Sequence, residues 1–308
     1  MTRATLRRRR RTRWSPPRPD FPKAARRGRE GAHDQRVPPL PALRIATWNI
    51  NSVRLRLPLL ADLDAALKPD VLCLQETKCP DELFPHEGIR ALGFEHVIAR
   101  GMKGYNGVAV LSRIPFVVRG EDPDWCMKGD CRHVGVTLDA PGGPIDLHDF
   151  YVPAGGDIAD REANPKFAHK LDFIAEATAW FAQQGPVRRS VLVGDLNIAP
   201  LEHDVWSHKQ LLDVVSHTPI EVEAMGGWMR AGDWHDALRH FVPAEQKLYT
   251  WWSYRAKDWA AADRGRRLDH VWVSQDLCGS LVRHEILKPA RGWEKASDHV
   301  PVMVELAL

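Results

Sequence analysis

The segment Val71-Leu72-Cys73-Leu74-Gln75-Glu76-Thr77-Lys78 places a carboxylate directly after a short apolar run. The run Val71 to Leu74 predicts a buried strand, because it is short, apolar and preceded by the helix-ending residues Pro69 and Asp70. A carboxylate at the end of such a strand is costly unless it is paired or coordinates a cation. Glu76 is therefore a candidate metal ligand, and the alternative is an ion pair with a neighbour such as Lys78.

Four other segments share this arrangement, in which acidic, amide or histidine side chains stand where a strand-like run ends. They are Ala46-Thr47-Trp48-Asn49-Ile50-Asn51, Gly194-Asp195-Leu196-Asn197, Arg267-Leu268-Asp269-His270 and Ser297-Asp298-His299. Such side chains can converge at one rim of a sheet, where they hold a hard divalent cation and act on a phosphate. A single motif of this kind carries little weight, but five in one chain indicate a metal-dependent phosphodiesterase.

Strand and helix patterns alternate irregularly along the chain. Strands are predicted at 43–50, 71–74, 107–111, 133–138, 145–152, 190–194, 268–273 and 300–306, and helices at 55–67, 166–184 and 234–241. Several strands alternate apolar and polar residues. This mixture favours antiparallel or mixed sheets that pack together and are covered by helices.

Composition limits the class of protein. The 308 residues, 44% of them hydrophobic, suffice for one large domain or two small ones. No apolar run approaches the roughly 20 residues that span a bilayer. The five cysteines are odd in number and lack finger-like spacing, which indicates reduced thiols. There is also no secretory apolar segment, so we expect a cytoplasmic protein that is not secreted.

The basic charge belongs to one end of the chain. Residues 1–42 hold 13 Arg or Lys and 3 acidic residues, a net of +10, and the remaining 30 basic and 37 acidic residues give −7. This Pro-rich tail has no apolar periodicity and is predicted to be disordered, with the catalytic domain at 43–308. It is a nucleic-acid-attracting arm, a targeting segment or an upstream extension of little consequence.

The spacing of the polar side chains suits attack on a phosphate. Asp195 and Asn197 lie two residues apart, so on an extended segment they point to the same side. A carboxylate can activate water and an amide can donate to a phosphate oxygen, although an Asx turn would explain the pair as well. A carboxylate behind the ring of His299 would keep that ring cationic near neutral pH or let it act as an acid or base, and a plain surface-loop histidine is the alternative.

These motifs, from about Leu43 to Leu308, resemble the exonuclease III-type abasic-site endonucleases within the endonuclease/exonuclease/phosphatase superfamily. Asp-x-Asn and Ser-Asp-His are shared across that superfamily, whereas Gln-Glu-Thr-Lys, Tyr-x-Pro and the aromatic run before Arg-Leu-Asp are more specific to the abasic-site branch. The carrying segments are Trp48 to Asn51, Leu74 to Lys78, Gly104 to Ala109, Tyr151 to Pro153, Gly194 to Pro200, Trp252 to Arg255, Arg267 to Asp269 and Ser297 to Pro301.

The resemblance implies a four-layer α/β sandwich of two packed mixed sheets, with the site at one rim. It also implies a role for each matching residue. Glu76 would be the principal Mg²⁺ ligand with Asn49 beside it and Asp298 nearby, and the wider set of metal-site residues adds Asp195, Asn197 and His299. Asp195 would activate water, Asn197 and Tyr151 would bind the attacked phosphate, and His299 would contact that phosphate while Asp269 orients its ring.

The aromatic and basic residues predict a DNA partner. Aromatic side chains interleaved with basic ones suit a loop that stacks on or wedges into DNA, and a buried aromatic cluster is the alternative. The predicted DNA contacts are Arg54, Lys78, Lys103, Tyr105, Trp251 and Trp252. Two positions depart from the family pattern, since Ala154 follows Tyr-x-Pro where an amide is common, and Arg266 stands where some relatives have a bulky apolar side chain.

The sequence therefore predicts a monomeric Mg²⁺-dependent DNA repair hydrolase, with Mn²⁺ as a possible substitute. It would cut double-stranded DNA 5′ to abasic sites and trim blocked 3′ ends. The alternatives are a superfamily phosphatase acting on a lipid or inositol phosphate and a non-catalytic DNA-binding relative.

Overall fold

The protein contains two six-stranded sheets, and each combines one parallel pair of strands with antiparallel pairs. The computed structural model describes residues 41–120 and 123–308. In the first sheet β1 (Ala42–Asn49) runs parallel to β2 (Val71–Gln75), and in the second β7 (Ile145–Tyr151) runs parallel to β8 (Ser190–Asp195). The other neighbouring strands of these sheets pair antiparallel. Both sheets are therefore mixed, as predicted.

The strand order brings distant parts of the chain together. The first sheet has the order β13 (Leu281–Ile286), β14 (Val302–Ala307), β1, β2, β4 (Tyr105–Ser112) and β3 (His96–Met102). The second has the order β5 (Phe116–Val118), β6 (His133–Leu138), β7, β8, β12 (Asp269–Ser274) and β9 (Trp234–Asp236). A separate hairpin joins β10 (Trp251–Trp252) to β11 (Gly265–Arg266). The last strand of the chain pairs with the first.

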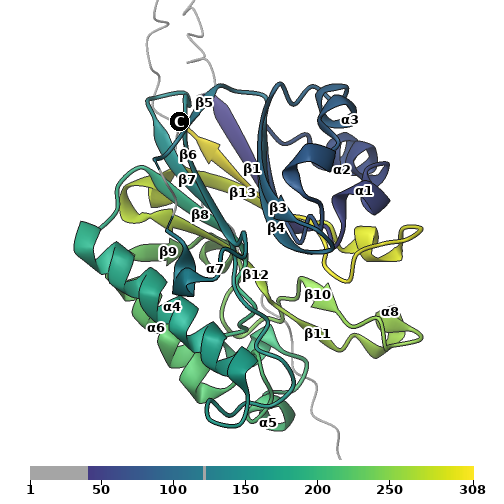
Figure 1. Ribbon diagram of the computed structural model, residues 1–308, viewed down its shortest axis with the longest axis vertical. Coiled ribbons are helices and arrows are strands. Elements are labelled where there is room, and N and C mark those ends of the chain that lie inside the picture. The colour runs from purple at the N-terminus through teal and green to yellow at the C-terminus, as the bar shows by residue number, and fades with distance from the viewer. Residues whose placement is uncertain (1–40, 121–122) are drawn as a thin grey trace, which may run out of the picture. The chain divides into compact units, whose positions relative to one another are not determined.

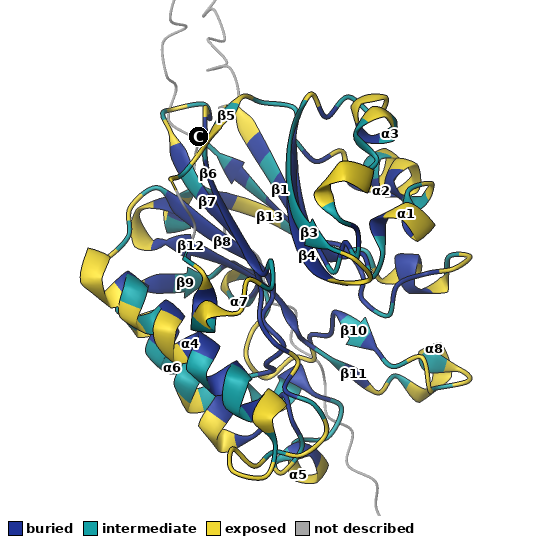
Figure 2. Ribbon diagram, viewed as in Figure 1, coloured by how far each residue is buried: buried dark blue, intermediate teal, exposed yellow. Residues whose placement is uncertain are grey.

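Each central strand is apolar on both faces. Leu43 and Ile45 of β1 lie in the core between the two sheets, whereas Ala46 and Trp48 point to the helices on the outside. This follows from the period of two along a strand. Figure 2 shows the result, with dark blue strands and helices that are yellow on their outer sides.

Helices cover the outer face of each sheet (Figure 1). The first sheet is covered by α1 (Val53–Arg56), α2 (Leu59–Leu67) and α3 (His86–Arg90), and the second by α4 (Pro165–Gln184) and α6 (Pro219–Gly232). Shorter helices are α5 (His208–Leu211), α7 (Ala237–Phe241) and α8 (Trp259–Ala262). The predicted four-layer α/β sandwich is confirmed.

Three local predictions differ from the structure. The helix expected at 55–67 is two helices, α1 and α2, that meet at Pro58, which has no backbone N–H to donate. The helix expected at 234–241 begins only at Ala237, because the three residues before it pair with β12. Helix α6 was not predicted, and its Gly226-Gly227 pair lowers its helix propensity.

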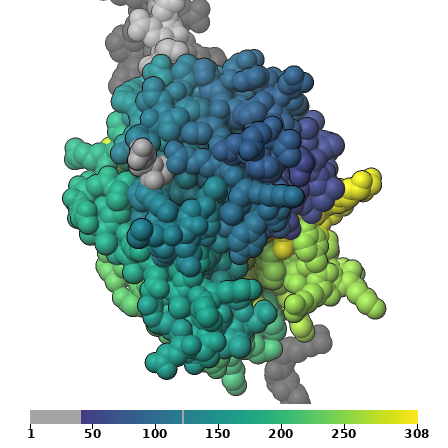
Figure 3. Space-filling model, in the orientation of Figure 1, coloured from purple at the N-terminus to yellow at the C-terminus, as the bar shows by residue number. Residues whose placement is uncertain are grey.

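Helix α1, early in the described chain, contacts the loop before the last strand. Arg56 donates to the carbonyls of Lys295 and Ala296 at 2.7 and 3.0 Å, and Figure 3 shows purple and yellow segments side by side there. None of the described helices combines the length and apolar character that a bilayer span requires. The five cysteines are free thiols. The disorder predicted for the tail falls on residues 1–40, which lie outside the described part of the chain.

Candidate active site

The register of the two sheets brings the predicted strand-end residues to one rim. The ends of β1 and β2 are paired, which places Asn49 next to Glu76. In the second sheet Asp195 ends β8, flanked by Tyr151 at the end of β7 and by Asp269 at the start of β12. The site therefore consists of side chains from both sheets.

Asn49 joins the two sheets through its side-chain amide. Its Nδ2 donates to Glu76 Oε1 and to Asp195 Oδ2, both at 2.9 Å. Glu76 Oε2 lies 2.7 Å from Lys78 Nζ, so the ion pair considered from the sequence is present. Burial opposes ionisation of Glu76, but hydrogen bonds from Asn49 and Lys78 and the charge of Lys78 lower its pKa. Glu76 is thus an anion at neutral pH.

His299 lies between two carboxylates. Its Nδ1 is 2.8 Å from Asp269 Oδ2, and its Nε2 is 3.7 Å from Asp195 Oδ2. Burial alone would lower the pKa of His299, but the charges of Asp269 and Asp195 outweigh it and raise the pKa to about 10. The imidazole is therefore cationic at neutral pH and can stabilise negative charge on a phosphate.

Asp195 is the centre of the cluster. Burial raises its pKa to about 7, and the charges of Asp269 and Glu76 add to this while the charge of His299 opposes it. A carboxylate with a pKa near neutrality is suited to accept a proton from water.

Asn197 and Tyr151 lie beside this carboxylate. Asn197 Nδ2 donates to Asp195 Oδ2 at 3.1 Å and to Val152 O at 2.9 Å. Its backbone has a φ of 55°, in the left-handed region that Asn tolerates. Tyr151 is 7% exposed, and burial, followed by the charges of Glu76 and Asp195, raises its pKa well above the usual value. Its hydroxyl therefore keeps its proton and remains a donor.

The donor set fits a hard divalent cation. Glu76 and Asp195 offer carboxylate oxygens within one connected cluster, which is the chemistry that Mg²⁺ prefers. The amide nitrogen of Asn49 faces these carboxylates and its Oδ1 accepts from Asn51 N at 3.1 Å, so Asn49 would have to turn its amide to offer that oxygen to a cation. Asp298 is adjacent, and its two oxygens accept from Asn51 Nδ2 at 3.2 Å and from Trp251 Nε1 at 2.9 Å.

A second group of possible ligands fits a metal less well. Ligand atoms of Asp195, Asp269 and His299 lie within 4.8 Å of one another. The Nδ1 of His299 is hydrogen-bonded to Asp269, however, and a protonated imidazole has no lone pair for a metal. We therefore favour the oxygen set around Glu76.

The residues predicted to contact DNA differ in exposure: some lie on the surface and others are partly or fully buried. Arg54, Lys103 and Tyr105 are exposed, with Tyr105 at 58%. Lys78 is half-buried and also bonded to Asn51 Oδ1 at 2.7 Å. Lys78 and Lys103 lie in loops after β2 and β3, Arg54 lies in α1, and Tyr105 is the first residue of β4.

The predicted DNA contact of Trp252 disagrees with the structure. Its side chain is only 2% exposed and cannot stack on DNA as the structure stands. Its indole Nε1 donates to Asp263 Oδ1 at 3.1 Å, and its ring packs edge-on against Trp259. The buried aromatic cluster considered as the alternative is the correct interpretation here. Trp251, in contrast, is half-buried and donates to Asp298.

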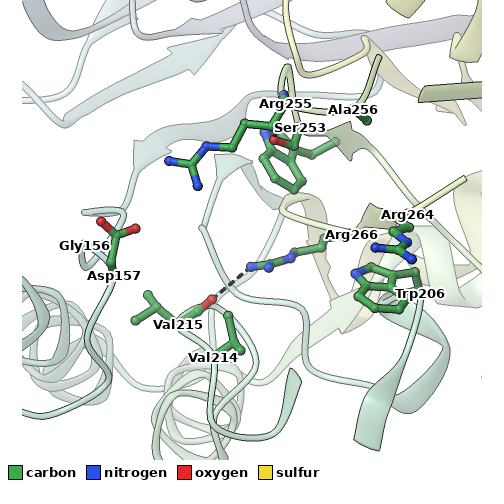
Figure 4. Close-up of a pocket in the computed structure, with 11 residues that line it drawn as sticks. Gly156, Asp157, Trp206, Val214, Val215, Ser253, Arg255, Ala256, Arg264 and Arg266 are labelled. Carbon is green, nitrogen blue, oxygen red and sulfur yellow. Dashed lines mark hydrogen bonds between the residues drawn. The ribbon is translucent and has the colours of Figure 1, made fainter. Parts of the chain in front are cut away.

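A pocket of about 630 Å³ opens beside Trp251 (Figure 4). Three arginines line it: Arg255, Arg264 and Arg266. The Arg266 guanidinium lies 5.4 Å from the centre of the Trp251 ring, so the position that departs from the family pattern faces this pocket. Among the described residues these arginines form no ion pair. The pocket is therefore suited to an anionic ligand.

Sequence reasoning missed residues that support the site from behind. Thr250 Oγ1 donates at 2.6 Å to the same Asp269 oxygen that His299 contacts. Gln75 Nε2 donates to Asp149 Oδ1 at 2.6 Å and so links the two sheets beneath the rim. Gln75 lies in a quoted motif and could have been considered, whereas no pattern in the sequence marks Thr250.

Known proteins with similar sequences and folds are nucleases and related hydrolases. The model of the Endonuclease/Exonuclease/phosphatase family matches residues 46–299. Exodeoxyribonuclease III of Haemophilus influenzae is 31% identical over 271 residues, which cover 85% of this chain and 99% of that protein.

Two solved structures superpose on most of the chain. An AP endonuclease from Archaeoglobus fulgidus has a TM-score of 0.76 and 31% identity, covering 86% of this chain and all of that one (100%). A 3′ phosphatase from Neisseria, solved with a product DNA hairpin, has a TM-score of 0.77 and 30% identity, with coverage of 86% and 100%.

Proposed function

Because the chain belongs to the endonuclease/exonuclease/phosphatase family, we propose that it cuts double-stranded DNA 5′ to abasic sites and trims blocked 3′ ends, using Mg²⁺ or, in its place, Mn²⁺. That the chain is a nuclease of DNA repair follows from its relatives. The lesion and the metal are the proposal, together with monomeric action on DNA in the cytoplasm. The AP endonuclease and the 3′ phosphatase among the similar structures support it.

The observation that carries the proposal is the position of Asp195 between two functional groups. On one side Asn49 links it to Glu76, and on the other side lies the His299 cation, backed by Asp269. Asp195, the proton acceptor, thus lies between the carboxylate that would bind a metal cation, Glu76, and the fixed positive charge of His299. Hydrolysis of a phosphodiester needs these three elements.

The chain's own residues account for the proton and the developing charge. Asp195 takes a proton from the attacking water, because its pKa near 7 matches the operating pH. The positive ring of His299 stabilises the charge that builds up on the phosphoryl oxygens. Tyr151 and Asn197 each donate a hydrogen bond to a phosphate oxygen, Asn197 in exchange for its bond to Asp195. As the water oxygen bonds to phosphorus, the bond from phosphorus to the 3′ oxygen breaks, and that oxygen takes a proton from solvent and leaves as the 3′ hydroxyl.

Glu76 and Asn49 would hold the cation, with Asp195 and Asp298 within reach of it. A bound Mg²⁺ would supply Lewis-acid polarisation of the phosphate and neutralise charge on the oxygens. The carboxylates of Glu76 and Asp195, which share the amide of Asn49, are consistent with this use.

DNA recognition is assigned to the exposed residues at the same rim. Arg54 and Lys103 would meet backbone phosphates, and Tyr105 would contact the sugar or a base face. The arginine-lined pocket beside Trp251 would receive the sugar and phosphate at the lesion.

The test is incision of a duplex that bears one abasic analogue, with and without Mg²⁺. We expect a cut 5′ to the lesion that leaves a 3′ hydroxyl, and no product in chelator. Asp195→Asn, which removes the proton acceptor, should still bind the duplex but lose turnover. An undamaged duplex with a 3′ phosphate measures end trimming in parallel.

Other outcomes would favour the alternatives. Release of phosphate from an inositol phosphate, without incision of DNA, would indicate a superfamily phosphatase. Binding of the duplex without any product would indicate a non-catalytic relative. Incision that is unaffected by chelator would contradict the metal requirement.

A further inference from the structure

A fully buried ion pair lies behind the loop that carries Asn197. Lys170 of α4 and Glu221 of α6 are both 0% exposed, and Lys170 Nζ lies 2.5 Å from Glu221 Oε1. Lys170 Nζ also donates to the backbone carbonyl of Asn197 at 2.7 Å. Removing two charges from water costs several kcal/mol per ion, and an apolar pair is often at least as stable. Stability alone is therefore a weak reason for this pair.

Glu221 connects the pair to a second segment. Its carboxylate accepts from the backbone N–H of Ser216 at 3.0 and 2.9 Å and from Thr218 Oγ1 at 2.6 Å. Ser216 in turn accepts from Ala199 N at 2.7 Å. The segment at 216–218 is thus tied to the loop after β8 from two directions.

Both segments carry parts of the candidate active site. Asn197 has a left-handed backbone and directs its Nδ2 to Asp195 Oδ2. Arg266 donates to Val215 O at 3.0 Å and to Ser216 Oγ at 2.7 Å, so the wall of the arginine-lined pocket rests on the segment that Glu221 holds (Figure 4). One ion pair therefore supports both Asn197 and the pocket wall.

We propose that Lys170 and Glu221 are positioning residues, which fix the Asn197 peptide against Asp195 and hold the adjoining pocket wall in register with it. Neither residue touches the substrate, and Lys170 acts through the carbonyl of Asn197. The inference rests on the proposed role of Asn197 in phosphate binding. A shift of about 1 Å in such a group can lower turnover by about 100-fold.

The test distinguishes an effect on the position of Asn197 from an effect on the stability of the folded protein. Lys170→Met alone leaves a buried, unpaired Glu221 and is expected to unfold the protein in part. The double variant Lys170→Met/Glu221→Gln removes both charges, and Gln still accepts from Ser216 and Thr218. We expect its melting temperature to recover most of the loss seen in Lys170→Met, while kcat stays about 10- to 100-fold below wild type and KM for DNA changes little.

A double-mutant cycle with Asn197→Ala gives the decisive readout. If Lys170 acts through Asn197, the pair substitution should cost kcat much less in the Asn197→Ala background than in the wild-type background. All variants are compared at a temperature where circular dichroism shows each to be folded. The matched control is Arg113→Met/Asp64→Asn, which removes an ion pair outside the site and should show equal effects in both backgrounds.

Recovery of kcat together with the melting temperature would overturn the positioning role, and so would equal losses in the two Asn197 backgrounds. Each activity is measured on the abasic duplex and on undamaged 3′ ends. If the wild-type protein leaves the abasic duplex intact but degrades 3′ ends, the proposed lesion is wrong while the cycle can still be read on the 3′ ends.

Discussion

At the scale of single residues, the rim brings together carboxylates from both sheets, Glu76 and Asp195. Glu76 and Asp195 both accept from Asn49, and the Lys78 ammonium and the His299 ring lie close to these carboxylates. Clustered carboxylates of this kind repel one another and raise the cost of burial. Their arrangement is understandable as a site that a cation completes.

Glu76→Gln tests that cation site. Gln can still accept from Asn49 Nδ2, so the fold should be kept, but it lacks the charged oxygen that Mg²⁺ prefers. We expect the Mg²⁺ concentration for half-maximal incision to rise by about 10- to 100-fold. Titration of activity with Mg²⁺ measures this, with melting temperature as the control. An unchanged Mg²⁺ requirement would remove Glu76 from the metal site.

Asp269→Asn tests the charge on His299. The charge of Asp269 is the largest influence that raises the pKa of His299 against the effect of burial. If the cation is needed, activity is lost as pH rises through that pKa, which is about 10 in the wild-type protein. Without the Asp269 charge the pKa falls, so the alkaline limb of the kcat profile should move to lower pH. Coincident alkaline limbs for the two proteins would argue against a required cation.

At the scale of elements, the short strand β10 presents two adjacent tryptophans to opposite surroundings. Trp251 is half-buried at the pocket, and Trp252 is packed among Tyr249, Ala290 and Val300. Adjacent strand residues point to opposite faces. The same dipeptide thus serves the site with one ring and the core with the other.

Trp252→Ala should therefore act through stability. The loss of a buried tryptophan costs about 3–5 kcal/mol of unfolding free energy. We expect a lower denaturant midpoint and an unchanged ratio of abasic incision to 3′-end trimming at a temperature where the variant is folded. Trp251→Ala is the comparison and should alter that ratio with a smaller change in stability. A changed ratio in Trp252→Ala would mean that its ring does reach the substrate.

At the scale of the whole molecule, the charge is distributed unevenly along the chain. Residues 1–40 hold the 13 basic and 3 acidic residues of the tail, a net of +10, and the rest of the chain is net negative at −7. A nuclease needs its substrate, a polyanion, to approach an acidic site. A basic segment can supply that attraction without taking part in the chemistry.

Deletion of residues 1–40 should therefore weaken DNA binding and flatten its dependence on salt, since fewer phosphate counterions would be released. The kcat should not change, because the described site is made of residues from 49 to 299. Binding isotherms at several salt concentrations measure both slopes. Equal slopes for the full-length and shortened proteins would exclude an electrostatic role for this segment.

Much of this molecule was determined by the sequence alone. The order of apolar strands, their polar ends and the long helix α4 follow from local patterns, which also marked Glu76 and Asp195 as candidates. The four-layer fold and the role of Asn49 were expected from the family resemblance. The physical reason is that side chains alternate between the two faces of a strand, so the sequence shows which faces are buried. A carboxylate is costly inside a buried strand unless it is paired, so the end of the strand is where it is expected.

The tertiary structure decided what depends on neighbours distant in the chain. Trp252 became a core residue because Asp263 and Trp259 close around it. Thr250, Lys170 and Glu221 gained their connection to the site only through contacts with residues distant in the sequence, Thr250 with Asp269 and the Lys170–Glu221 pair with the backbone of Asn197. Burial and hydrogen bonding of a polar side chain are set by residues far away in sequence, and no local period encodes them.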